Sequence, residues 1–148
     1  MKKKWIISLI AIVIAVICAY FVLVQPKLDA DLAATTGHKK SVVIDLDNGG
    51  FHDIKLQKVV VNGKTKPDIA KLQGDGDNIV ISDTFDEKGV NFFNYKTTPI
   101  PPTKYEKDGT KSIDTGYYLS LHDKSEIHSV DITYTYLGKT FHSGLTIN

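Results

Sequence analysis

The sequence predicts an all-β extracytoplasmic domain that follows one N-terminal transmembrane helix. Three observations predict this class: a long uncharged run near the N-terminus, short runs of alternating apolar and polar residues after it, and turn residues recurring about every 8 to 12 residues. Together they favour an antiparallel, immunoglobulin-like β-sandwich of about seven to nine short strands. A chain of 148 residues has room for one such domain after the helix.

The transmembrane helix is expected at residues 5–24. This run carries no charge, and at about 1.5 Å rise per residue its helix covers roughly 30 Å, the thickness of a bilayer's hydrocarbon core. Trp5 lies at one end of the run and Tyr20 near the other, where amphipathic rings favour the headgroup level. We therefore expect the helix to contact the lipid bilayer, with Trp5 and Tyr20 as its interfacial anchors.

The placement of lysines predicts the orientation of this helix. Residues 1–4 include three lysines, whereas Lys27 on the other side is offset by two nearby aspartates. By the positive-inside rule, residues 1–4 are cytoplasmic and the rest of the chain lies outside the membrane. Residues 25–40 are small, polar and without a period, so we expect a stalk there, with the exported β-sandwich domain at residues 41–148.

A cleaved signal peptide is the main alternative for the N-terminal segment. Its apolar core is usually about 7–15 residues long and precedes a small-x-small cleavage site. Here the core is longer, and the nearest small residues, Ala30, Ala33 and Ala34, include no pair spaced by one residue. A lipoprotein signal at Cys18 is disfavoured because the bulky Ile17 precedes it. We predict an uncleaved signal anchor; the alternative is a domain secreted after cleavage near Ala33 and Ala34.

The strand pattern begins directly after the expected stalk. Apolar side chains alternate through residues 41–47 and 51–61, with a change of parity that indicates a bulge near Lys58. Asn62-Gly63 suits a two-residue hairpin turn with both residues at positive φ. Pro67 then limits the return strand to a short or edge position.

Short strands continue through the second half of the chain. We expect them at residues 79–85, 90–95, 116–122, 128–137 and 140–148. Residues 68–73 are short and ambiguous, and residues 97–112 contain three prolines, which indicates a loop. Gly144 in the last strand indicates a bulge.

The composition argues against some partners and locations. Without its three N-terminal lysines the chain has 15 lysines against 17 acidic residues, which is not the basic footprint of a nucleic-acid-binding domain. Arginine, the residue of bidentate phosphate and base recognition, is absent from the sequence. Cys18, the only cysteine, lies inside the expected helix, so the exported domain has no disulfide. We expect no nucleic-acid partner and a place in a bacterial cell envelope.

Five residues are weak candidates for metal ligands. Asp75 and Asp77 share a tight turn, but the spacing does not complete a calcium-binding loop. His122, His128 and His142 flank two hairpins and lack the close same-face spacing of a zinc motif. We therefore predict polar turns and exposed histidines here, and no metal or other cofactor.

No motif supplies a catalytic nucleophile or a pair of catalytic acids. The sequence has no Gly-x-Ser-x-Gly elbow, and outside the expected helix it has no cysteine. The aromatic residues Phe92, Phe93 and Tyr95 fit partner binding, but they also favour strands. We predict no catalytic residues and a non-enzymatic role: binding a protein partner or assembling a complex in the envelope. The alternative is a small envelope metal-binding protein or enzyme that uses surface histidines and aspartates.

Overall fold

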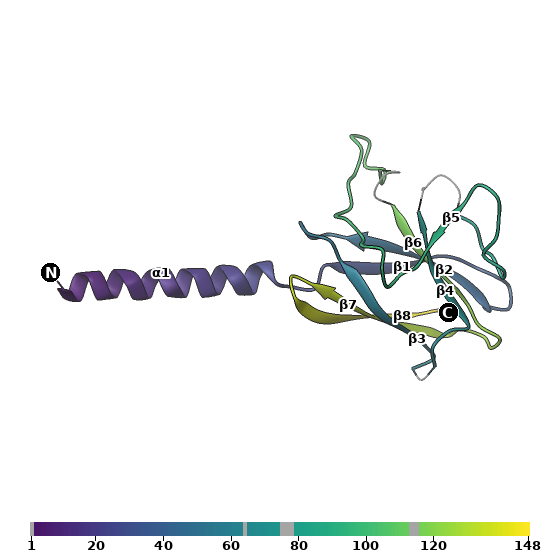
Figure 1. The fold of residues 1–148 in the computed structure, drawn as a ribbon, viewed down its shortest axis with the longest axis horizontal. Helices are drawn as coiled ribbons and strands as arrows, with labels where there is room; N and C mark the ends of the chain where they lie inside the picture. The colour runs from purple at the N-terminus through teal and green to yellow at the C-terminus, as the bar shows by residue number, and fades with distance from the viewer. Residues whose placement is uncertain (1, 64, 75–78, 113–115) are drawn as a thin grey trace.

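A computed structural model describes residues 2–63, 65–74, 79–112 and 116–148 (Figure 1). In these ranges the chain forms one helix followed by eight strands. They are α1 (Lys2–Leu23), β1 (Leu28–Thr35), β2 (Ser41–Asn48), β3 (Lys55–Val61), β4 (Ile69–Gly74), β5 (Asn91–Phe93), β6 (Tyr117–His122), β7 (Ser129–Tyr136) and β8 (Lys139–Thr146).

Helix α1 extends away from the β domain (Figure 1). Its segment Lys4–Leu23 has a mean hydropathy of 3.1 and is 0% buried. The helix is long and apolar enough to cross a membrane, and a bilayer would remove these side chains from water. The prediction of one N-terminal apolar helix is confirmed.

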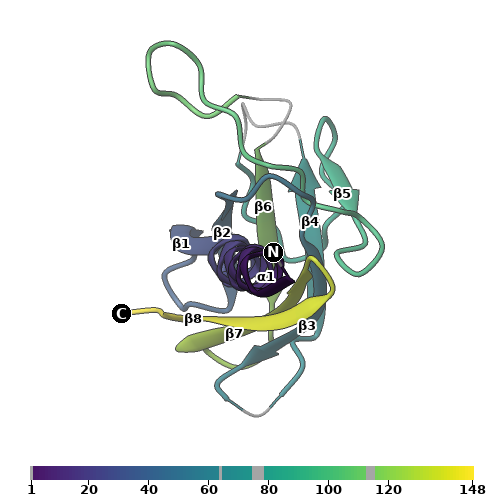
Figure 2. The ribbon, with the colours of Figure 1, turned by 90° about the vertical axis from the view of Figure 1, so that its left-hand side faces the viewer.

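The strands form two antiparallel sheets, as the alternating pattern predicts. One sheet has the strand order β1-β2-β6-β4-β5, and the other has the order β3-β7-β8. The view along α1 shows the two sheets stacked as layers, with β7 and β8 below the larger sheet (Figure 2). Buried apolar residues of both sheets form one core cluster between the layers.

Strand β7 supplies much of this core because every second residue points inward. Val130, Ile132, Tyr134 and Tyr136 are each at most 1% exposed, as their spacing predicts. Full burial of such side chains stabilises the fold by roughly 1.5–3 kcal/mol each. Two local predictions for β3 and its turn are also confirmed: the register shifts between Leu56 and Lys58, and both residues of Asn62-Gly63 have positive φ.

The expected stalk at residues 25–40 is wrong for most of its length. Residues Leu28–Thr35 form β1, which pairs with β2 at the edge of the larger sheet. Leu28 and Ala30 point into the core, and each is 8% exposed. Alanine and aspartate are poor strand formers, so the pattern hid a strand that pairing with β2 stabilises. Only a few residues therefore separate α1 from the β domain.

The strand expected at residues 79–85 is also wrong. The side chain of Gln73 forms two hydrogen bonds with the backbone of this segment. Its Nε2 donates to the Val80 carbonyl over 2.6 Å, and its Oε1 accepts from the Val80 amide over 3.1 Å. A side-chain amide thus takes the place of a neighbouring strand.

The bulge expected at Gly144 is absent, since Gly144 pairs in continuous register with Asp131. The ambiguous residues 68–73 belong mainly to β4.

The close approach between Gly50 and Tyr136 gives a test of the core. A Cβ at position 50 would lie 2.8 Å from three atoms of the Tyr136 side chain, which is 1% exposed and has no room to move. We expect Gly50→Ala to lower the free energy of unfolding by about 1–3 kcal/mol through overpacking. A Cβ at Gly37 would meet nothing within 4 Å, so Gly37→Ala is the matched control. Urea titration of both variants checks this; equal stabilities would contradict the contact.

Candidate functional site

The junction between α1 and the β domain is held by the hydroxyl group of Tyr134. Its Oη accepts hydrogen bonds from the Lys27 amide over 3.2 Å and from the Leu28 amide over 3.3 Å. The Tyr134 ring is fully buried in the core, so this acceptor has a fixed position. The backbone shortly after α1 is therefore tied to the C-terminal end of β7, more than a hundred positions away in the sequence.

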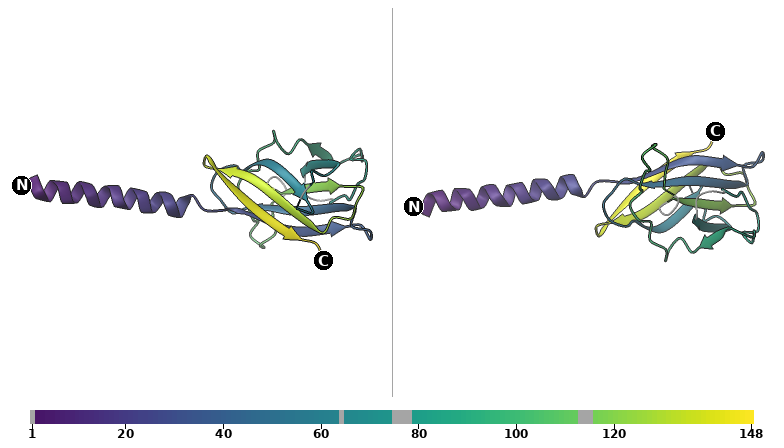
Figure 3. Two further views of the ribbon diagram at one scale, coloured as in Figure 1. Left: turned by 90° about the horizontal axis from the view of Figure 1, so that it is seen from below. Right: turned by 90° about the horizontal axis from the view of Figure 1, so that it is seen from above.

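The turn between β7 and β8 reaches the end of α1 (Figure 3). The Lys139 ammonium lies 4.7 Å from the ring centroid of Tyr20 and 5.5 Å from that of Phe21. Such cation–π contacts contribute about 0.5–1 kcal/mol at exposed sites. Tyr20, an expected interfacial anchor, thus contacts the β domain directly, whereas Trp5 at the far end of α1 is 77% exposed.

Four aspartates lie on the outer face of β1 and β2. Asp29 stands opposite Asp47, and Asp31 stands opposite Asp45 in the antiparallel register. Like charges directly opposite each other destabilise a sheet. Asp45 and Asp47 both belong to strand β2.

Two side chains from the loop after β5 offset this acidic face. The Lys111 ammonium lies 2.5 Å from Asp45 Oδ1 and donates to the Leu46 carbonyl over 2.9 Å. The Tyr105 hydroxyl donates to the Asp47 carboxylate. This hydrogen bond is the largest cause that raises the pKa of Tyr105 to about 12, ahead of burial and of the charges of Asp47, Asp45 and Asp29.

Ser41, His122 and Asp83 form a polar group at one end of β2 and β6. Ser41 Oγ lies 2.8 Å from His122 Nδ1, Asp83 Oδ1 lies 3.3 Å from the same nitrogen, and the Ser41 hydroxyl donates to Asp83. A catalytic triad needs the serine and the acid on opposite nitrogens of the imidazole. Here both lie at Nδ1, and Ser41 is fully buried. The group cannot relay a proton to a substrate, and we assign it a structural role.

The structure does not bring the histidine candidates together. His122 belongs to the group just described, His128 Nε2 lies 3.8 Å from Glu126 Oε2, and His142 Nδ1 lies 3.2 Å from Thr133 Oγ1. In the described ranges no three His, Cys, Asp or Glu residues are grouped closely enough to hold a metal ion. Asp75 and Asp77 lie outside the described residues.

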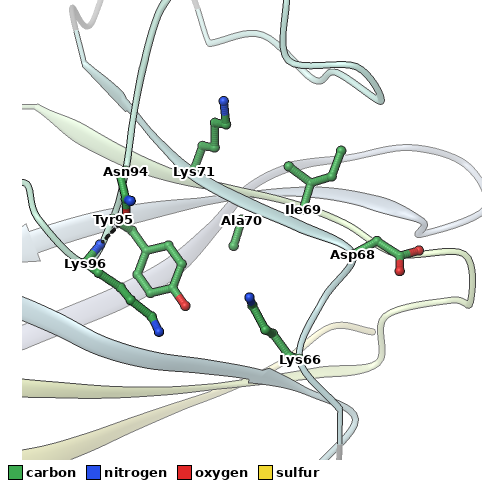
Figure 4. A pocket seen from close by; sticks show the side chains of 8 residues that line it. All are labelled: Lys66, Asp68, Ile69, Ala70, Lys71, Asn94, Tyr95 and Lys96. Carbon is green, nitrogen blue, oxygen red and sulfur yellow. Dashed lines mark hydrogen bonds between the residues drawn. The ribbon is translucent and has the colours of Figure 1, made fainter.

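Beside β4 the domain has a pocket of about 410 Å³ that sequence reasoning missed (Figure 4). Lys66 and Lys71 line it from the segment that enters β4 and from β4 itself, and Tyr95 and Lys96 line it from the segment after β5. The hydroxyl of Tyr95 points into the pocket between the side chains of Lys66 and Lys96 (Figure 4). These residues are distant in sequence and follow no motif, so only the pairing of β4 with β5 assembles them.

The chain matches no protein-family model, no curated protein and no solved structure. Its function therefore has to be inferred from the residues themselves.

The hydrogen bond between Tyr105 and Asp47 gives a pH test. We expect Tyr105 to titrate near 12 in the parent chain and at a lower pH in Asp47→Asn, which loses the charged acceptor. Because folding raises this pKa above the ordinary 10.0, the contact contributes stability below pH 10.0, and the contribution is lost as the pH rises through about 12.

Asp31→Asn is the matched control for this test. It removes a carboxylate from the same face, but Asp31 is not among the groups that raise the pKa of Tyr105. NMR titration of the Tyr105 ring in the three chains measures the effect. If Tyr105 in Asp47→Asn titrates at the same pH as in the parent, the hydrogen bond to Asp47 does not raise the pKa of Tyr105.

Proposed function

We propose that this chain is a single-pass membrane protein that displays an immunoglobulin-like β-sandwich at the outer surface of a bacterial cell membrane. Its role is non-enzymatic: it binds a protein partner in the envelope or helps to assemble a membrane complex. The observation that carries the proposal is the junction, where Lys139 contacts Tyr20 and the backbone amides just before β1 donate to the Tyr134 hydroxyl, so that the β domain is held on the end of an apolar helix.

The strand order supports the immunoglobulin-like class. Strands β1, β2, β6 and β4 follow each other as strands A, B, E and D do in the constant-type domain. Strands β3, β7 and β8 likewise correspond to C, F and G, and β5 is an additional edge strand next to β4. Because this architecture serves many functions, it supports a binding role only together with the junction.

The position of β1 supports an anchor that is kept. The alternative of cleavage near Ala33 and Ala34 would cut inside β1, where Ala34 pairs with Val43. Cleavage there would remove Leu28 and Ala30 from the core cluster and expose the edge of β2. An exported domain that needs these residues for its core is therefore not released by cleavage near Ala33 and Ala34.

The short connection between α1 and β1 limits where a partner can be. A flexible stalk would let the domain search a volume that grows with the length of the stalk. Here the Gly49 amide donates to the Lys27 carbonyl over 2.9 Å, in addition to the hydrogen bonds that Tyr134 accepts, so the connection is fixed to the domain. The domain therefore meets partners close to its own membrane, such as a neighbouring membrane protein.

Protease accessibility tests the topology. We expect trypsin added to intact protoplasts to cut a C-terminally tagged chain within its β domain, and an N-terminal tag to stay protected. The three lysines near the N-terminus predict this orientation through the positive-inside rule. Full protection of the C-terminal tag, or a chain of reduced mass found in the medium, would contradict the anchored, outward-facing arrangement.

Metal analysis of the same full-length chain, purified in detergent, separates this role from the alternative. We expect no stoichiometric metal. One equivalent of zinc, copper or calcium would favour a metal-binding protein or a metalloenzyme.

A further inference from the structure

We propose that the pocket beside β4 is a binding site for an organic phosphate ester, with Lys66, Lys96 and Tyr95 holding the phosphoryl group. The site lies wholly in the β domain, so the inference does not depend on the direction in which α1 crosses the membrane. The role proposed above gives the β domain a protein partner near the membrane. The pocket would in addition bind a small molecule or a phosphorylated ligand.

The backbone brings the three side chains to one place. Leu72 of β4 pairs with Phe93 of β5, and the chain then continues beside the first half of β4. Tyr95 and Lys96 thereby face the segment that leads into β4, from which Lys66 projects (Figure 4). Lys71 lines the rim and points away from the Tyr95 hydroxyl (Figure 4).

The pocket carries positive charge that the protein does not neutralise. Within the described ranges, no carboxylate lies within 4.0 Å of the ammonium groups of Lys66, Lys71 or Lys96, whereas Lys111 on another face has Asp45. Asp68 also lines the pocket, but its carboxylate accepts from the Lys124 amide over 3.1 Å and points away from Tyr95 (Figure 4). A low-dielectric hollow lined by one sign of charge concentrates the opposite ion.

Tyr95 adds a neutral donor to this charge. The residue is 5% exposed and belongs to the core cluster, and no described residue makes a hydrogen bond to its hydroxyl. The oxygen itself is not buried: it faces the open pocket, where a ligand oxygen can accept a hydrogen bond from the hydroxyl. Burial raises the pKa of Tyr95, so at neutral pH the hydroxyl is protonated and can donate.

The donors define the chemical class of the ligand. Two ammonium groups and one phenolic hydroxyl require a ligand that is anionic and accepts several hydrogen bonds. A phosphoryl group has these properties, and lysine binds it as a point charge. The pocket of about 410 Å³ falls in the range of ligand sites, roughly 300–1,000 Å³, and is lined also by Ala70 and by the Tyr95 ring. An ester with an apolar group fits it better than inorganic phosphate does.

The position of the pocket argues against a lipid headgroup of the anchoring membrane. Ile69, which lines the pocket, pairs with His122, and His122 pairs with Ser41 at the start of β2. The other end of β2 is Asn48, which pairs with Leu28 beside α1. At about 3.3 Å per residue, the length of β2 separates these ends by more than 20 Å. The ligand is therefore free in solution or carried by another molecule.

Titration of phenyl phosphate into the full-length chain in phosphatidylcholine nanodiscs tests the site. We expect saturable binding that weakens as salt is added. The double variant Lys66→Gln/Lys96→Gln should weaken it at least about tenfold, since each lost ammonium removes a charge-assisted hydrogen bond. The matched control Lys88→Gln/Lys107→Gln removes the same charge from exposed positions that do not line the pocket, and we expect a change within about twofold.

Tyr95→Phe separates binding from folding. The substitution keeps the ring in the core and removes only the hydroxyl that lacks a partner. We expect weaker phenyl phosphate binding by about threefold to tenfold, with a free energy of unfolding that is unchanged or higher. A variant that loses stability but binds like the parent would overturn the role of Tyr95.

Three competitors test which part of the ligand is recognised and whether the ligand is a lipid headgroup. Inorganic phosphate should compete weakly, and phenol, which lacks the charge, should not compete. Added vesicles of phosphatidylglycerol should leave the affinity for phenyl phosphate unchanged; competition by them would assign the site to a headgroup of an apposed membrane. The inference is overturned if phenyl phosphate fails to bind at millimolar concentration, if phenol binds equally well, or if Lys66→Gln/Lys96→Gln binds like the parent.

Discussion

The structure depends on the burial of two tyrosines of β7 whose hydroxyl groups keep hydrogen-bond partners at the end of the domain next to α1. Tyr134 accepts from the Lys27 and Leu28 amides, and Tyr136 accepts from the Phe51 amide over 3.2 Å. Each ring contributes to the core while its oxygen fixes a segment that is distant in sequence. The same strand thus stabilises the contact between the sheets and determines where the chain from α1 enters the larger sheet.

The remaining charged features follow from the two-layer architecture. The larger sheet places Asp29 and Asp31 opposite Asp47 and Asp45, and the loop after β5 returns over this face to supply Lys111 and Tyr105. The pocket beside β4 differs because no described carboxylate lies within 4.0 Å of its lysine ammonium groups, although Asp68 also lines it. One cluster is partly offset inside the molecule and the other is open to a ligand, although the chain as a whole is close to neutral, with a formal charge of +1.

Much of the fold could be predicted from local pattern, and the exceptions have physical causes. The alternation in β7 and the positive φ of Asn62 and Gly63 are local signals, and the structure confirms both. The predicted two-residue turn is wrong in length, because Val61 pairs with Thr65. Strand β1 was hidden because its stability comes from pairing with β2. The segment at residues 79–85 has a strand-like composition but bonds to the side chain of Gln73 instead. The pocket could not be predicted, since its lysines and tyrosine meet only through strand pairing.

We propose above all that the β domain is fixed on the end of the apolar helix α1. Spin labels on Cys18, the only cysteine, and on Gly37→Cys at the far end of β1 measure this directly by pulsed electron resonance in nanodiscs. We predict one narrow distance distribution in the full-length chain. A reference chain with a glycine-serine insertion between Pro26 and Lys27 should give a broad distribution. An equally broad distribution in the parent chain would contradict this proposal, because it would mean that the domain moves freely relative to α1.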